Sequence, residues 1–172
     1  QELYGNITDR LTQDIDLLIH PGDTRRALEI MQDLGYSPIR SEKKTDPQQF
    51  QRVKKNYTLI HPGKRVVCEL HWQLFSNPYL CPQTKIWWEN PSVVTLEDQP
   101  LPVMNRENQL LYLCLYGCYH EYFRLFWLRD IAHITEKWNL NREEIYRKVS
   151  GEGLAGPLQV SLQLAKLVFG AE

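Results

Sequence analysis

The sequence lacks the features that define several large classes of protein. No apolar run approaches the ~18 residues that a membrane-spanning helix needs. The first stretch, QELYGNITDR, has neither the basic start nor the apolar middle of a signal peptide. The net charge is only -1, from 20 basic and 21 acidic residues, and no basic stripe favours nucleic acid or an anionic membrane as a partner. We therefore expect a globular, cytoplasmic protein without a membrane partner.

Cysteine is also scarce. The four cysteines, Cys68, Cys81, Cys114 and Cys118, contain no C-x-x-C pair of the zinc-binding type. Cys114 and Cys118 have the i, i+4 spacing of neighbours on one helix face. We interpret all four as reduced residues of the core rather than as metal ligands.

The first half of the chain shows patterns of both strands and helices. Apolar runs at 14–19, 56–60 and 65–74 predict strands, and the last two flank a turn over residues 61–64 and so form a hairpin. Residues 23–35 have helical apolar spacing that ends at a glycine. Residues 41–52 are polar and contain a proline, and they predict an exposed loop.

The second half of the chain has a different pattern, with helical periodicity after a proline-rich segment. After a small α/β core over residues 1–75, the proline-rich segment 76–104 predicts a connection. Residues 105–172 contain four segments with helical periodicity and helix caps, the first of which starts at Asn105. We predict an α+β protein, in which a small mixed β-sheet with flanking helices is followed by a C-terminal helical bundle.

Two aspartates lie at the start of the first predicted strand. Side chains alternate along a strand, so Asp14 and Asp16 point to one face, with Cα atoms roughly 6.5 to 7 Å apart. In the run 65–74, Glu69 and His71 likewise share a face. If the two strands lie side by side, the three carboxylates meet on one surface and repel one another unless cations neutralise them. A Mg²⁺ site would supply that neutralisation.

Each of these residues also has an ordinary structural interpretation. Aspartates at the start of a strand are often solvated, and Glu69 alone is typical of a surface residue. His71, beside a tryptophan, is either a hydrogen-bonded structural histidine or a residue of the cleft. Arg10 either binds phosphate or is a solvated loop arginine. Asp130 lies near the edge of the apolar stripe of a helix and has two interpretations. It has a structural role, in a salt bridge or as the cap of a neighbouring helix, or it faces a cleft together with His120.

Four stretches of the sequence carry a resemblance to known proteins: LYGNITDRLTQDIDLLI, LGYSP, VVCELHW and LLYLCLYGCYHEYFRLFWLRDIAHI. In this order they resemble the bacterial nucleotidyltransferase-like family, a remote branch of the DNA polymerase β type nucleotidyltransferases. The most specific pieces are the arginine four residues before the D-x-D, the E-L-H-W, and the histidine, leucine and tryptophan that precede D-I-A. The resemblance implies a nucleotidyltransferase-like sheet in the first 75 residues.

The resemblance also implies a chemistry. In the wider superfamily the D-x-D pair binds two Mg²⁺ ions, and a third acidic residue on a neighbouring strand completes the site. By position these roles fall on Asp14, Asp16 and Glu69, with Mg²⁺ or Mn²⁺ as the cofactor, and Arg10 is a candidate for binding phosphate. The implied reaction moves a nucleotidyl group from an NTP to a hydroxyl of a small molecule, peptide or protein, and a nucleic-acid acceptor is not favoured.

Two departures from the family pattern leave a second hypothesis open. The Lys-Gly motif that cradles the triphosphate in this branch would lie before Gln1, so we expect part of the N-terminal core to precede the sequence. Tyr116 stands where the family usually has a histidine, although His120 keeps the second histidine position. The rival hypothesis is a non-catalytic binding or partner-interaction module that keeps the nucleotidyltransferase fold.

Overall fold

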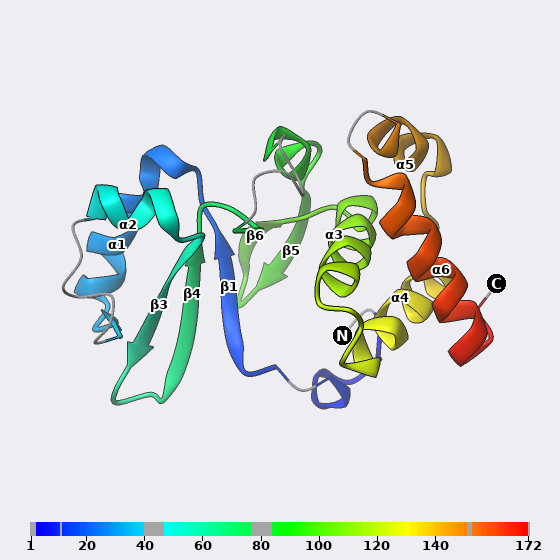
Figure 1. The fold of residues 1–172 in the computed structure, drawn as a ribbon. Coiled ribbons are helices and arrows are strands. Elements are labelled where there is room, and N and C mark those ends of the chain that lie inside the picture. Colours follow the sequence, from blue (N-terminus) through cyan, green and yellow to red (C-terminus); the bar gives the residue numbers. More distant parts are fainter. Residues whose placement is uncertain (1–2, 11, 40–46, 77–83, 151–152, 172) are drawn as a thin grey trace. The chain divides into compact units, whose positions relative to one another are not determined.

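The chain is organised as two compact units. A computed structural model describes residues 3–10, 12–39, 47–76, 84–150 and 153–171. The unit that contains the main sheet, called the sheet unit, is Arg10–Leu80, and the helical unit is Gln1–Asp9 together with Cys81–Glu172. Figure 1 shows strands in the first and mostly helices in the second. The predicted α+β class is confirmed, whereas the domain boundaries drawn from the sequence stay predictions.

The sheet unit contains a four-stranded mixed sheet with the strand order β1–β4–β3–β2. The strands are β1 (Asp14–Leu18), β2 (Ser37–Pro38), β3 (Asn56–His61) and β4 (Val66–His71). β1 pairs with β4 in parallel, and the other two pairings are antiparallel. A parallel pair requires a long crossover, and the chain between β1 and β4 supplies it. The mixed sheet and the β3–β4 hairpin that the sequence predicts are confirmed.

Helix α1 (Thr24–Asp33) follows β1 after a short turn, η2 (Pro21–Asp23). Its residues Ala27, Leu28 and Met31 have helical spacing and pack on the core of the sheet unit. The predicted helix is therefore confirmed, and it covers one face of the sheet.

A second helix, α2 (Pro47–Val53), corrects the loop predicted over residues 41–52. Residues 40–46 lie outside the described part of the chain, but the rest of the expected loop is helical from Pro47, a residue favoured in the first helical turn. Phe50 is only 4% exposed, and its ring stacks on Tyr57 with a centroid distance of 4.5 Å. A single apolar residue anchors this helix, so the sequence offers no stripe by which to detect it.

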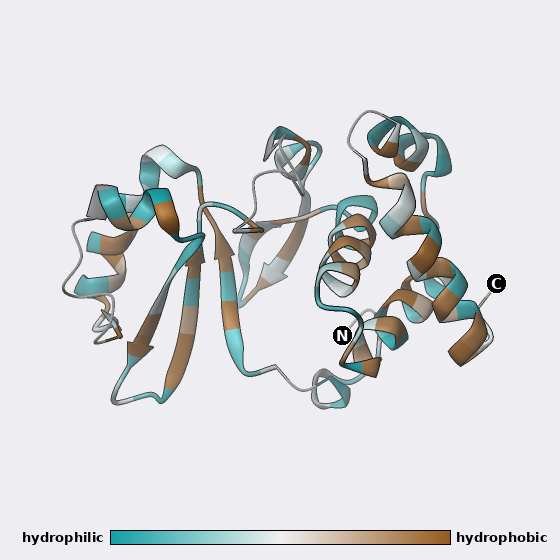
Figure 2. Cartoon of the chain, viewed as in Figure 1, coloured by the Kyte–Doolittle hydropathy of each residue, from teal (hydrophilic) through white to brown (hydrophobic). Residues whose placement is uncertain are grey.

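The two faces of the sheet differ in polarity. The core cluster on one face consists of Met31, Phe50, Tyr57, Leu59, Cys68, Leu70 and Trp72. The register places Ile15 beside Cys68, and Cys68 beside Leu59, so apolar residues of three strands share this face. Figure 2 shows the alternation as bands of opposite hydropathy along β1. The opposite face carries the polar residues of the same strands, together with Leu18, Ile60 and Val67.

The helical unit begins its described part with η1 (Ile7–Asp9), continues with η3 (Thr84–Trp88) and a two-stranded hairpin, and ends with four helices. The four helices are α3 (Arg106–Tyr119), α4 (Leu125–Lys137), α5 (Arg142–Val149) and α6 (Ala155–Phe169). They confirm the helical bundle that the sequence predicts. None of the helices in the described part of the chain is long and apolar enough to span a membrane.

The predicted caps fix the ends of these helices. The side chain of Asn105 accepts a hydrogen bond from the Asn108 N–H at 2.8 Å, and that of Asn141 accepts one from the Glu144 N–H at 3.1 Å. These bonds satisfy amide groups that have no partner within the helix. At the other end, Gly170 closes α6 with a left-handed φ of 74°.

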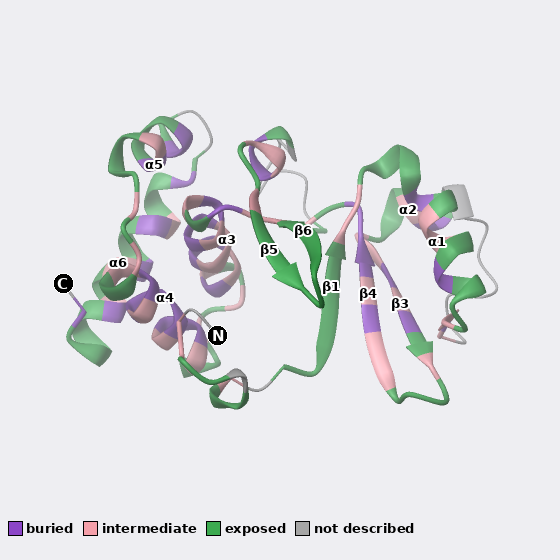
Figure 3. Cartoon of the chain, turned by 180° about the vertical axis from the view of Figure 1, so that it is seen from behind, coloured by how far each residue is buried: buried purple, intermediate pink, exposed green. Residues whose placement is uncertain are grey.

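The bundle has its own apolar core. Buried residues recur on the inward sides of α3, α4 and α6, which pack on one another, and Figure 3 shows them as purple bands. The most buried are Leu110, Leu111, Cys114, Ile131, Ile134 and Ala165. Cys68 and Cys114 are buried free thiols and Cys118 is a half-buried one, as the sequence predicts, while Cys81 lies outside the described residues.

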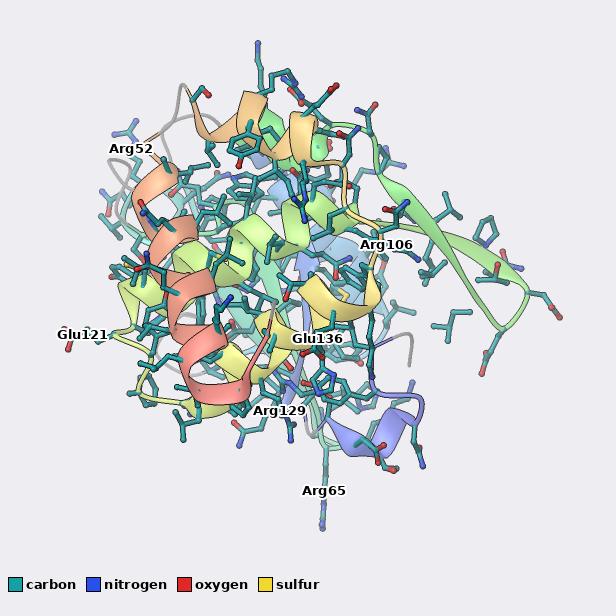
Figure 4. The ribbon with its side chains drawn as sticks, turned by 90° about the vertical axis from the view of Figure 1, so that its right-hand side faces the viewer. Arg52, Arg65, Arg106, Glu121, Arg129 and Glu136 are labelled. Atoms are coloured by element: carbon teal, nitrogen blue, oxygen red, sulfur yellow. The ribbon has the colours of Figure 1, made fainter. Side chains whose placement is uncertain are left out.

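The hairpin lies within the predicted connection 76–104 and consists of β5 (Ser92–Leu96) and β6 (Gln99–Val103). Glu97 and Asp98 form its two-residue turn with φ of 47° and 62°, the positive values of a type I′ turn. In Figure 4 the hairpin extends away from the helices of its own unit, and Figure 3 shows it as exposed.

Candidate functional site

The register of β1 and β4 brings acidic residues of distant sequence positions together. Asp16 lies directly opposite Glu69, and Leu18 lies opposite His71. Because side chains alternate, Asp14, Asp16, Glu69 and His71 all project from the polar face of the sheet. The whole arrangement lies within the sheet unit.

His71 connects the two facing carboxylates. Its Nε2 is 3.0 Å from Asp16 Oδ1 and 3.1 Å from Glu69 Oε2. The His71 side chain is 7% exposed, compared with 25% for Glu69 and 63% for Asp16. One buried imidazole thus meets two carboxylates that are open to solvent to different degrees.

The neighbouring strand β3 holds Glu69 in place. Thr58 is the partner of Glu69 in the β3–β4 register, and its Oγ1 donates a hydrogen bond to Glu69 Oε1 at 3.3 Å. The two oxygens of Glu69 therefore have different contacts, one with Thr58 and one with His71. The carboxylate is therefore held from both neighbouring sides, by the hydroxyl and by the imidazole.

The electrostatics distinguish the two aspartates. The hydrogen bond with His71 lowers the pKa of Asp16, and the positive charges of His71 and Lys55 act in the same direction. Partial loss of hydration raises the pKa of Asp14, and the charges of Asp16 and Glu69 raise it further. His71 and Lys55 therefore stabilise Asp16 as a carboxylate, whereas Asp14 is affected by the negative charges beside it.

A metal ion fits this donor set. Asp16, Glu69 and His71 each offer one ligand atom, and these atoms lie within 4.8 Å of one another. Carboxylate oxygens are ligands for Mg²⁺ and Mn²⁺, and imidazole nitrogen is a ligand for transition metals. Asp14 lies on the same face but outside this close group. The strands therefore bring two of the three predicted metal ligands together, add His71, and leave Asp14 at the margin.

The remaining predicted site residues lie elsewhere. Arg10 is half-buried and opens the sheet unit, a few residues before β1. His120 belongs to the helical unit, at the end of α3, where its ring lies 4.4 Å from that of Tyr116 and 5.6 Å from that of Trp127. It forms part of an aromatic cluster.

Asp130 also belongs to the helical unit. It is 5% exposed on α4 and accepts a hydrogen bond from the Tyr4 hydroxyl. The Arg129 guanidinium, labelled in Figure 4, lies 5.0 Å from the centre of the Tyr4 ring, and His133 lies 4.9 Å from it. Asp130 therefore holds the N-terminal segment against α4.

Two residues of the site region were missed by the sequence analysis. Thr58 lies opposite Glu69, and the charge of Lys55 reaches Asp16. The alternation of the predicted β3–β4 hairpin would have identified Thr58, because counting back from the turn pairs it with Glu69. No pattern in the sequence indicates Lys55.

A solved structure shares this fold. The chain resembles the crystal structure of an antigenic nucleotidyltransferase-like protein from Paracoccidioides brasiliensis, with a TM-score of 0.57 and 19% sequence identity. The match covers 98% of this chain and 75% of that chain. At this identity the likeness shows a nucleotidyltransferase-like fold and nothing more. A comparison with curated proteins gives no match.

The family follows from the sequence itself. Residues 1–170 match the model of a family described as uncharacterised nucleotidyltransferases. The chain belongs to this family. The resemblance to nucleotidyltransferases seen in the sequence is thereby confirmed, and membership implies an NTP as the substrate.

Proposed function

We propose that this protein is a nucleotidyltransferase of the DNA polymerase β type, in its bacterial nucleotidyltransferase-like branch, and that it transfers a nucleotidyl group from an NTP to an acceptor hydroxyl. The observation that carries the proposal is the β1–β4 register, which sets Asp16 opposite Glu69 with His71 between their oxygens. Family membership supports the same reaction class. The acceptor in this proposal is a small molecule, a peptide or a protein.

The site is suited to Mg²⁺ or Mn²⁺. Such ions, when bound, polarise the α-phosphate, lower the pKa of the acceptor hydroxyl and stabilise the leaving pyrophosphate. Asp16 and Glu69 would hold the ion from two adjacent strands, so that the backbone hydrogen bonds of the sheet fix their separation. Asp14 would supply a further carboxylate on the same face, for a second ion or for a bridging contact.

Cationic side chains would complete the binding of the NTP. Lys55 carries a positive charge whose effect reaches Asp16, which suits contact with a triphosphate. Arg10 precedes β1 and has the planar fork that binds phosphate oxygens in pairs. Thr58 would act on Glu69 alone, by keeping one carboxylate oxygen engaged while the other faces the site.

Release of pyrophosphate tests the proposal. The protein is incubated with each NTP and Mn²⁺ or Mg²⁺, and transfer to the protein itself is recorded too, because a neighbouring hydroxyl can replace the true acceptor. Asp16→Asn keeps the shape of the side chain but removes its charge, and it should lower the rate by roughly 10² to 10³-fold. Asp33→Asn, an exposed aspartate at the end of α1, is the matched control and should retain full activity.

The outcomes separate an enzyme from a binding module. Equal activity of the wild type and Asp16→Asn would contradict the proposal that Asp16 belongs to the active site. Metal that raises the melting temperature of the wild type but not of Asp16→Asn, with no pyrophosphate released from any NTP, would instead favour the non-catalytic module. Activity that depends on Asp16 and on added metal would establish the transferase.

A further inference from the structure

We propose that His71 is itself a ligand of the metal ion, through Nε2, so that the site is a mixed nitrogen and oxygen site that favours Mn²⁺ over Mg²⁺. The inference rests on the proposed function in one respect, because it assumes a metal ion on the polar face of the β1–β4 pair. It goes further by naming the atom that binds the ion and the class of ion that the site selects.

The spacing of the three donor atoms carries the first step. The distances from His71 Nε2 are 3.0 Å to Asp16 Oδ1 and 3.1 Å to Glu69 Oε2. Adjacent ligands of an octahedral ion with bonds of about 2.1 Å lie about 3 Å apart. Two of the three separations are thus already those of adjacent ligands on one ion, and the third, between the carboxylate oxygens, is no more than 4.8 Å.

The burial of the imidazole carries the second step. His71 is 5% exposed, and its Nδ1 has no hydrogen-bond partner among the described residues. Buried polar atoms normally have such partners, and a histidine ligand also uses its second nitrogen to hold its ring. The observations that bear on the ligand role are therefore the burial of the ring and the position of Nε2 between the two carboxylates. Within the described part of the chain, the polar contacts of the ring go to Asp16 and Glu69. The protein therefore directs a buried nitrogen into the position where a cation neutralises the two carboxylates.

The chemistry of the donor set then selects the ion. Mg²⁺ is a hard ion that prefers oxygen and retains its water molecules, whereas imidazole suits transition metals, and among these Mn²⁺ is the ion that also suits carboxylate oxygen. A site with two carboxylates and one imidazole should bind Mn²⁺ at least about tenfold more tightly than Mg²⁺. A site made only of carboxylates has no nitrogen ligand and would therefore lack this source of preference for Mn²⁺.

The competing role for His71 is that of a positioning residue. In that case Nε2–H would donate hydrogen bonds to both carboxylates and orient them, while the ion would have only oxygen ligands. Substituting His71 lowers metal affinity in either case, because groups that orient the ligands also contribute about 10- to 100-fold. The decisive quantity is therefore whether nitrogen is bonded directly to the metal.

Electron spin echo spectroscopy of Mn²⁺ bound to the wild-type chain measures this bond directly. A directly bound histidine nitrogen should give a nuclear modulation that changes when the protein is produced with nitrogen-15 histidine. This comparison needs no substitution, so it does not depend on whether a variant folds. It also needs no NTP and no turnover.

Two variants extend the test to ion selectivity. His71→Gln should remove the nitrogen modulation and weaken Mn²⁺ binding by roughly 10- to 100-fold, with a smaller loss for Mg²⁺. His61→Gln is the matched control, because His61 ends β3 and its Nδ1 accepts a hydrogen bond from the Lys64 N–H at 3.1 Å. Calorimetry should find both affinities unchanged in that control.

The results distinguish this inference from the proposed function. Bound Mn²⁺ without nitrogen modulation would overturn the role of His71 as a ligand and leave the transferase proposal standing. Failure of the wild type to bind Mn²⁺ or Mg²⁺ would overturn both. A histidine modulation in a protein that releases no pyrophosphate would support the ligand role and contradict the proposed activity.

Discussion

Replacing Lys148 with methionine should destabilise the helical unit more than replacing any exposed charged residue of the same helix. Lys148 lies in α5, and its side chain is 0% exposed. Its Nζ donates to Asn108 Oδ1 at 2.6 Å and lies 2.8 Å from Glu144 Oε1. A buried lysine of this kind is stable only because both partners are present.

The magnitude follows from what Lys148→Met leaves behind. Methionine fills most of the space of the lysine stem, so little apolar packing is lost. Asn108 is 0% exposed, and its Oδ1 would lose the Lys148 hydrogen bond, which costs about 1–3 kcal/mol. Glu144 is 19% exposed on its side chain and would lose its ion pair, although water would partly replace the lysine. We expect a total loss of about 3 kcal/mol.

Arg147→Met is the matched control, because it removes the same charge from the neighbouring position of the same helix. Arg147 pairs with Glu89 at 3.0 Å, but the two side chains are 60% and 37% exposed. Such a pair contributes at most about 1 kcal/mol. Urea unfolding followed by far-UV circular dichroism measures both variants. Equal losses in the two variants would refute the reasoning that burial gives Lys148 its importance.

Three further results are expected. Phe50→Ala should lower the free energy of unfolding by about 3–5 kcal/mol, whereas Val53→Ala, 72% exposed on the same helix, should change it by less than about 0.5 kcal/mol in urea titrations. Gly117→Ala should destabilise α3, because its new Cβ would lie 2.5 Å from Cε1 of Tyr122, and a double-mutant cycle with Tyr122→Leu should remove most of that cost. The hydrogen bond with the buried lysine lowers the pKa of Glu144. The stability from this bond is fully present above the ordinary glutamate pKa and is lost as the pH falls through the lower folded value, so acid unfolding curves of Glu144→Gln and the wild type should converge at low pH.

Local patterns were sufficient for the elements that carry the site. Alternation along β1 and β4 placed Asp14 with Asp16 and Glu69 with His71, because the side-chain period of a strand is fixed by its backbone. The caps at Asn105 and Asn141 are equally local. These features depend on neighbours in sequence, so the sequence contains all the information that they need.

Features that depend on distant contacts could not be predicted in the same way. Alternation alone did not require β1 to pair with β4, since a parallel pairing depends on the crossover between them. The hydrogen bond that Asp130 accepts from Tyr4 joins residues 126 positions apart, and the place of Asp130 on a helix could not indicate it. The helix around Phe50 forms because the ring packs on Tyr57, and the sequence of this helix has no periodic pattern that predicts the contact.

The prolines of the hairpin have a consequence for how the protein behaves at high concentration. In a hairpin with a two-residue turn, Leu96 and Gln99 form the hydrogen-bonded pair next to the turn, so Pro100 and Pro102 face outward along β6. The outer edge of β6 therefore lacks amide donors at both positions, and only β5 can accept another strand. If two molecules join through β5, both outer edges of the joined sheet are proline edges. Such pairing ends at two molecules and does not propagate into a fibre.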